Sequence, residues 1–201
     1  MRFRLKLGGL ALFAAVALAG CATFQTPTRS NPDNGAIFGY FDIPSDSYGS
    51  LQSLSILRYP GSVRPYIGIP NDVPYVIHEG AFFAYNAKPG QYYVMSIFTY
   101  GGGLFGNKQY QMNLLQFKFG DPAYNEKLLK ENLITVKPQE LHYLGAKKIY
   151  VGKHEGLLSN GSFSIGPDEK ITEKQVIEKL LPALKGTPWE KPVNDLYASL
   201  K

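Results

Sequence analysis

The fold is decided by a stretch that reads AFFAYNAKPGQYYVMSIFTY over residues 81–100. Its first part, 81–85, and its last part, 91–100, are rich in aromatic and β-branched residues, which favour strands. Between them, Pro89 and Gly90 fit a tight turn. Side chains along the last part alternate between the two faces of an extended chain. The stretch therefore predicts two strands joined by a turn.

Similar short segments recur on both sides of this stretch, separated by turns rich in Pro, Gly, Asn and Asp. The chain has 201 residues with 14 Tyr and 12 Phe, and it also carries 21 Gly and 14 Pro. This composition and spacing predict one mainly β domain over residues 36–166, built as a sandwich or barrel. The further predicted strands cover 36–43, 51–59, 63–69, 73–80, 110–119, 133–136, 141–152 and 161–166.

Two segments carry a family resemblance. Residues 87–98, AKPGQYYVMSIF, resemble the signature of transthyretin-like domains of the carboxypeptidase regulatory type, in which a Pro-Gly turn leads into a strand bearing a Tyr. Residues 136–149, VKPQELHYLGAKKI, have a similar Lys-Pro turn and strand. The resemblance implies a transthyretin-like antiparallel β-sandwich, as in bacterial envelope lipoproteins of unknown function. It implies binding or scaffolding and assigns no catalytic residue.

A short helix is predicted between two of the strands, over residues 121–133. Asp121 stands where its carboxylate can cap the first helical turn. Pro122 then occupies the first helical position, where a missing N–H breaks no hydrogen bond. We expect this helix to interrupt the series of strands without ending the domain.

Helical periodicity dominates the C-terminal segment, residues 167–201. In 171–185, apolar side chains recur at intervals of three and four residues, which predicts one apolar helical face. Thr172 and Gln175 have the spacing of a capping box. A second short amphipathic helix is predicted over 189–200. We expect this pair of short helices to pack on the sandwich.

The first 20 residues have the pattern of a signal peptide. Arg2, Arg4 and Lys6 precede a run without charges over 7–20. A helix of about 14 residues is roughly 21 Å long, whereas the hydrocarbon core of a bilayer is about 30 Å thick. The run is therefore too short to span a membrane unaided. A basic start, a short apolar run and small residues at its end are typical of a secretory signal.

The signal ends in Leu18-Ala19-Gly20-Cys21, which resembles the lipobox of bacterial lipoproteins at every position. The resemblance implies cleavage after Gly20 and lipidation of Cys21, with two acyl chains linked through its sulfur and a third, such as palmitate, on its amino group. Three chains anchor a protein stably without a spanning helix. Because no aspartate follows Cys21, the enteric sorting rule favours the outer membrane in a host that has one. Whether the domain faces the periplasm or the cell surface stays open.

Residues 21–35 then read as a flexible, polar tether between the lipid and the domain. Removing residues 1–20 takes away three positive charges and lowers the formal net charge from +5 to +2. No dense cluster of Lys and Arg remains, so the charge excludes nucleic acid as a partner. The partners we expect are the membrane, through the anchor, and an envelope protein.

The sequence carries no recognisable catalytic, cofactor or metal motif. Its histidines, His78, His142 and His154, lack the spacing of a zinc site, and Cys21 is its only cysteine. The Gly-x-Ser-x-Gly motif of many hydrolases is missing. Residues 101–108, GGGLFGNK, lack the Gly-Lys-Ser/Thr ending of a phosphate-binding loop. We therefore expect no catalytic residue, no cofactor and no metal, and predict that the protein is not an enzyme.

The glycine-rich segment predicts a hairpin tip that exposes Leu104 and Phe105 as a contact loop. The first hypothesis is therefore a lipid-anchored envelope lipoprotein that acts as a non-catalytic interaction or structural module. The alternative is a module that binds a glycan, such as peptidoglycan, or a small ligand on exposed tyrosines. The tyrosines in or near the predicted strands are Tyr40, Tyr66, Tyr75, Tyr85, Tyr92, Tyr93, Tyr100 and Tyr110.

Overall fold

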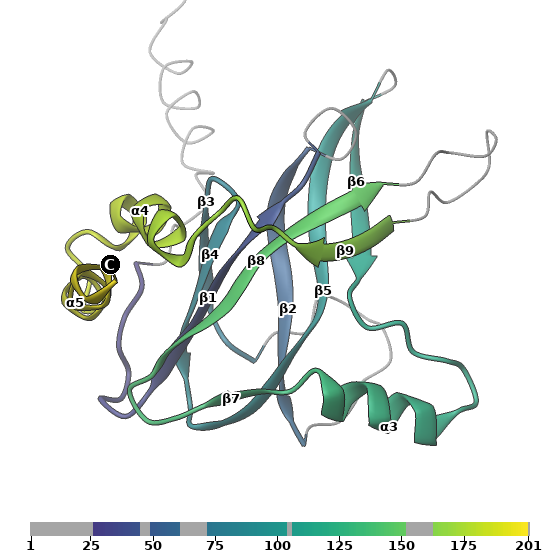
Figure 1. The fold of residues 1–201 in the computed structure, drawn as a ribbon, viewed down its shortest axis with the longest axis horizontal. Helices are drawn as coiled ribbons and strands as arrows, with labels where there is room; N and C mark the ends of the chain where they lie inside the picture. The colour runs from purple at the N-terminus through teal and green to yellow at the C-terminus, as the bar shows by residue number, and fades with distance from the viewer. Residues whose placement is uncertain (1–25, 45–48, 61–71, 104–105, 152–162, 201) are drawn as a thin grey trace, which may run out of the picture.

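The computed structural model describes residues 26–44, 49–60, 72–103, 106–151 and 163–200. Most of these residues form two β-sheets packed face to face, with three short helices outside them (Figure 1). The prediction of a mainly β fold is confirmed. The larger sheet has the order β3 (Tyr75–His78), β4 (Ala81–Ala87), β1 (Gly35–Asp42), β8 (Leu141–Val151) and β9 (Phe163–Pro167). The smaller sheet has the order β2 (Ser50–Tyr59), β5 (Gly90–Gly103) and β6 (Gly106–Asn113), and β7 (Ile134–Val136) also pairs with β5.

One strand pair departs from the antiparallel sandwich that the resemblance implies. β1 and β8 run parallel, with Ile37 beside His142 and Phe41 beside Lys147. The other pairs among the described strands are antiparallel. Side chains alternate along a strand in the same way in both kinds of pair, so the sequence pattern does not reveal strand direction. The larger sheet is therefore mixed.

The predicted turn over residues 86–90 carries the chain from the larger sheet into the smaller one. Asn86 and Gly90 adopt positive φ angles of 61° and 151°. The hydroxyl of Tyr92 donates a hydrogen bond of 2.7 Å to the carbonyl oxygen of Lys88. The turn and its two flanking strands are thus present, but the strands belong to different sheets.

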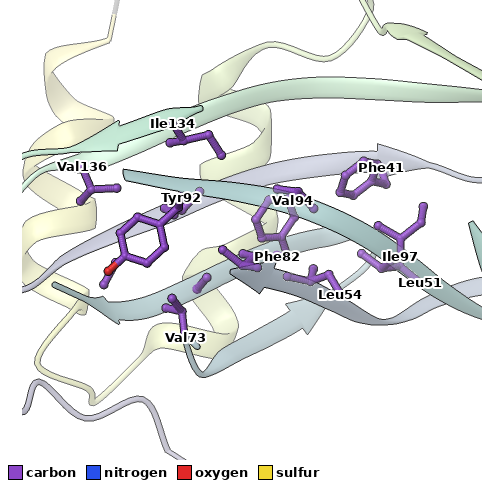
Figure 2. Packing of buried hydrophobic residues seen from close by; sticks show 14 of the residues in the cluster. Phe41, Leu51, Leu54, Val73, Phe82, Tyr92, Val94, Ile97, Ile134 and Val136 are labelled. Carbon is purple, nitrogen blue, oxygen red and sulfur yellow. The ribbon is translucent and has the colours of Figure 1, made fainter. Parts of the chain in front are cut away.

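The two sheets enclose one apolar core (Figure 2). Inner-facing side chains of both sheets meet there and are almost completely buried. Fully buried members come from three strands of the larger sheet and from both long strands of the smaller one. They include Ile37, Phe82, Ala84 and Ile149 on one side, and Leu54, Ile56 and Ile97 on the other.

Two C-terminal helices cover the outer face of the larger sheet (Figure 1). They are α4 (Glu173–Leu184) and α5 (Glu190–Ser199), and α4 begins with the predicted capping box of Thr172 and Gln175. Trp189, which precedes α5, is fully buried and stands edge-on to Phe83, with their ring centroids 5.4 Å apart. Burial of this apolar face attaches the helical pair to the sheet.

The N-terminal end of the described chain packs against these helices. The indole nitrogen of Trp189 donates a hydrogen bond of 2.9 Å to the carbonyl oxygen of Thr28. The guanidinium of Arg29 lies 4.9 Å from the centroid of the same ring system. Pro27 is also buried. Residues from 27 onward, which the sequence predicts to be part of the tether, therefore contact the folded domain.

The third helix, α3 (Pro122–Glu131), lies on the outer side of the smaller sheet. Asp121 caps it as predicted, because its carboxylate accepts a hydrogen bond of 3.0 Å from the Tyr124 N–H. Leu129 anchors the helix in a small apolar cluster with Tyr93 and Met95. β6 ends at Asn113, earlier than predicted, and the chain then crosses toward this cluster. No helix in the described ranges is long and apolar enough to cross a membrane.

Candidate ligand-binding cleft

A bulge in β8 sets the position of the candidate site. β1 advances two residues from Phe38 to Tyr40, while its partner β8 advances three, from Tyr143 to Ala146. Gly145 lies in this interval and has a φ angle of +92°, a conformation that side chains with a Cβ rarely adopt. Such a bulge changes which face of the sheet the following side chains occupy.

The bulge places Lys147 on the inner face of the larger sheet. Its strand partner in β1 is Phe41, whose side chain belongs to the core. The next residue, Lys148, faces outward, and its ammonium lies 2.9 Å from the carboxylate of Asp42. The two adjacent lysines therefore have different environments.

Beside Lys147, the two sheets separate and leave a cleft of about 340 Å³. It lies between the β8–β9 side of the larger sheet and the region where β5 meets β7 and the end of α3. Figure 2 shows Phe41, Val94 and Ile134, which belong to the core and also line the cleft. The lining residues are Phe41, Val94, Leu114, Leu115, Asn132, Ile134, Leu144, Lys147, Ile165, Gly166 and Pro167.

Only two of these lining residues have polar side chains, Lys147 and Asn132. The amide nitrogen of Asn132 donates a hydrogen bond of 2.8 Å to the carbonyl oxygen of Leu128, at the end of α3. No ion pair or hydrogen bond joins the half-buried Lys147 side chain to another residue in the described part of the chain. An apolar cleft with few polar groups is typical of small-molecule sites.

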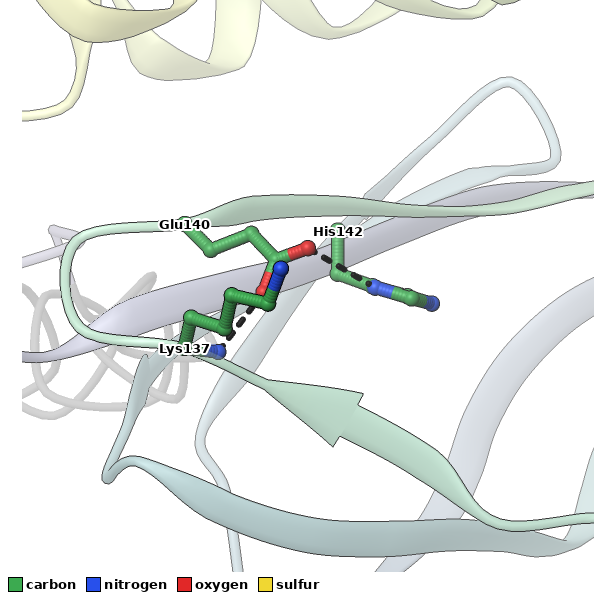
Figure 3. Close-up of polar contacts among 3 residues, drawn as sticks. All are labelled: Lys137, Glu140 and His142. Atoms are coloured by element: carbon green, nitrogen blue, oxygen red, sulfur yellow. Dashed lines mark hydrogen bonds and ion pairs between the residues drawn. The ribbon is translucent and has the colours of Figure 1, made fainter.

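A separate polar cluster holds the turn that leads into β8 (Figure 3). One carboxylate oxygen of Glu140 accepts a hydrogen bond of 2.6 Å from the Lys137 N–H. The other oxygen lies 3.3 Å from Nδ1 of His142. Burial acts to raise the pKa of Glu140, but the hydrogen bonds from Lys137 and His142 outweigh it and lower the pKa. This cluster fixes the turn and contributes no side chain to the cleft.

The histidines do not come together. His78 lies in β3, and its Nδ1 is buried without a hydrogen-bond partner among the described residues. His142 lies in β8, and strands β4 and β1 separate it from β3. His154 lies outside the described residues. Within the ranges that the structure covers, no three His, Cys, Asp or Glu side chains are grouped to hold a metal ion.

The lipidation site and the contact loop, Cys21, Leu104 and Phe105, lie outside the described residues. The hairpin that leads to this loop is present, since β5 and β6 pair as far as Gly103 and Gly106.

The tyrosines do not form an exposed row in the part of the chain that is described. Of the seven that are described, three are buried, three are half-buried, and only Tyr100 is exposed, at 48%. Burial raises the pKa of Tyr92, in the core between the sheets, and of Tyr93, in the outer cluster beside α3. The buried tyrosines are Tyr85, Tyr92 and Tyr93, the half-buried ones are Tyr40, Tyr75 and Tyr110, and Tyr66 lies outside the described residues.

Sequence reasoning missed the cleft because its walls come from six separate segments. The one local signal was Gly145, a glycine inside a predicted strand, which is a common sign of a bulge.

No family model, curated protein or solved structure matches this chain.

Proposed function

We propose that this protein is a lipoprotein of the bacterial cell envelope whose β domain is a non-catalytic module that binds a small ligand in the cleft. The anchor rests on the signal-like residues 1–20 and on Cys21 in its lipobox-like context. The outer membrane is its proposed location in a host that has two membranes. The lipid would hold the domain at the membrane surface, and the cleft would bind its ligand there.

One observation carries the binding function, namely the 340 Å³ cleft between the sheets. Its walls are mostly apolar and include Val94 and Leu144. Apolar surface that faces water is unfavourable. An apolar ligand in the cleft would remove part of that surface from water. The described tyrosines do not provide the stacking surface of the alternative, so the cleft replaces them as the proposed site.

A variant that fills the cleft tests this function. Leu144→Trp adds bulk to the cleft wall, and Tyr150→Trp is the control, because Tyr150 lies in the same strand and is 49% exposed. Both variants and the native chain are extracted from bacterial membranes and weighed by native mass spectrometry. We expect an added small-molecule mass on the native chain and on Tyr150→Trp, and none on Leu144→Trp. The same bound mass on all three proteins would contradict the proposal.

The hairpin of β5 and β6 favours a second candidate function, contact with an envelope protein. β2 pairs with β5 only as far as Tyr100, whereas β6 continues to Gly103, so the hairpin projects beyond the sheet. A projecting hairpin suits a contact made through its end, and the predicted contact residues Leu104 and Phe105 come between its two strands in the sequence. The Leu144→Trp variant separates the two candidates, because filling the cleft should leave such a contact unchanged.

A further inference from the structure

We propose that the cleft binds a single-chain amphipathic anion, an apolar chain that ends in a carboxylate, and that the Lys147 ammonium binds the carboxylate. This inference rests on the proposed binding function of the cleft and adds the chemical class of its ligand.

The position of Lys147 is the first argument. Its partners on the inner face are Phe41 in β1 and Pro167 in β9, neither of which offers a charge. The half-buried Lys147 is also the one charged residue among those that line the cleft. The neighbouring Lys148 has its anion in Asp42, whereas no described carboxylate pairs with Lys147. Charge complementarity therefore points to a ligand that brings the anion with it.

The apolar walls are the second argument. Phe41, Val94, Leu144 and Ile165 line the space next to the lysine, and they offer only dispersion contacts and release of water. Such walls suit methylene groups, and each buried methylene strengthens binding by about fourfold. A sugar or a peptide would lose hydrogen bonds to water here without replacement. The cleft thus offers a ligand one cation and otherwise mainly apolar walls.

The volume is the third argument. Sites for small molecules range from about 300 to about 1,000 Å³, and this cleft, at about 340 Å³, is at the lower end. It suits one short acyl chain better than a phospholipid with two. The backbone near Lys147 is also held in place, because the Asp168 N–H donates a hydrogen bond of 2.9 Å to the Ala146 carbonyl oxygen.

Photo-cross-linking with a diazirine analogue of decanoate tests the inference on the full chain in bacterial membranes. The cross-linked peptides are identified by mass spectrometry, and unlabelled decanoate, decan-1-ol or phosphatidylglycerol vesicles are added as competitors. Lys147→Met removes the charge and keeps a long apolar side chain. Lys148→Met removes the same charge from the outer face, and Lys147→Arg restores a cation. Thermal unfolding confirms that each variant folds.

We expect the label on peptides that line the cleft, and we expect decanoate to compete at about tenfold lower concentration than decan-1-ol, because a hydrogen bond to a charged group contributes that much. In Lys147→Met, decanoate and decan-1-ol should compete at equal concentrations. Lys148→Met and Lys147→Arg should keep the preference for decanoate.

Two results would overturn the inference and leave the binding function intact. One is equal competition by decanoate and decan-1-ol on the native chain, with label still in the cleft. The other is competition by phosphatidylglycerol that matches decanoate, which would assign the site to a two-chain lipid. If no saturable label reaches the cleft, and Leu144→Trp matches the native chain, the proposed function fails as well.

Discussion

At the scale of single residues, two adjacent lysines show where local pattern is insufficient. Lys147 and Lys148 have the same side chain, yet one faces the cleft and the other is paired with Asp42 on the outer face. Tyr143 faces outward. If side chains alternated regularly after it, Lys147 would face outward and Lys148 would face the core. The extra residue at Gly145 reverses that assignment.

Glu140 provides a residue-scale prediction about pH. Its pKa is lowered in the folded protein, so its contribution to stability is present above the pKa of the unfolded chain and is lost as the pH falls through the folded value. Glu140→Gln should therefore lower the free energy of unfolding by about 1 kcal/mol at neutral pH. The difference from the native chain should shrink toward zero once the pH falls below the folded pKa of Glu140. Urea unfolding from neutral to acid pH measures it.

The control for this prediction is Glu126→Gln. The carboxylate of Glu126 lies 2.8 Å from the ammonium of Lys130, but both side chains are 59% exposed. Solvent screens such a pair, so at neutral pH its loss should change stability less than the loss of Glu140. A larger loss of stability in Glu126→Gln, or a Glu140→Gln difference that grows in acid, would contradict the proposed contribution of Glu140 to stability.

At the scale of elements, local chemistry decides where helices and turns begin. Asp121 caps α3, and Thr172 with Gln175 caps α4, as the sequence predicts. These caps were predictable because each one joins atoms within three residues. After Asn113 the apolar pattern predicts a longer strand. The apolar side chains there, which include Leu115, instead cover the outer cluster beside Leu129 and do not extend β6.

Gly145 provides the element-scale prediction. A Cβ added there would be 3.9 Å from the nearest atom, in the Lys147 side chain, so space is not the obstacle. The φ angle of +92° is the obstacle, and such backbone strain costs about 1–3 kcal/mol for a non-glycine residue. Gly145→Ala should therefore lower the free energy of unfolding by about that amount, as measured by urea unfolding.

Gly120→Ala is the matched control, because Gly120 has a φ angle of +78° and nothing within 4 Å of an added Cβ, but lies in an exposed loop. We expect a cost from backbone strain at both sites. Only Gly145→Ala should also reduce labelling of the cleft by the decanoate analogue. Unchanged stability of Gly145→Ala would mean that the bulge does not depend on glycine.

At the scale of the whole molecule, the N-terminal segment connects the proposed anchor to the folded domain. Because Thr28 and Arg29 contact Trp189, only a few residues separate Cys21 from the packed part of the chain. An extended chain spans at most about 3.3–3.6 Å per residue. The domain would therefore lie close to the membrane, with the α4–α5 layer near the point of attachment.

The anchor itself is tested by Cys21→Ser in a bacterial host fed an alkyne analogue of palmitate. We expect the native chain to be labelled and shortened by its signal residues, because the proposed processing combines acylation of Cys21 with cleavage after Gly20. The Cys21→Ser variant should stay unlabelled and retain the full length on a gel. A variant that is still labelled and shortened would rule out Cys21 as the lipidation site.

The sequence by itself determined the strands around the turn at 86–90 and the caps of α3 and α4, because hydrogen bonds and side-chain patterns within a few residues specify them. Tertiary structure alone decided the parallel pairing of β1 with β8 and the packing of Trp189 on Thr28. It also decided the assembly of the cleft. These features join segments that are up to 161 residues apart, and their stability depends on which surfaces meet. A local pattern records that a side chain is apolar, but not which surface will cover it.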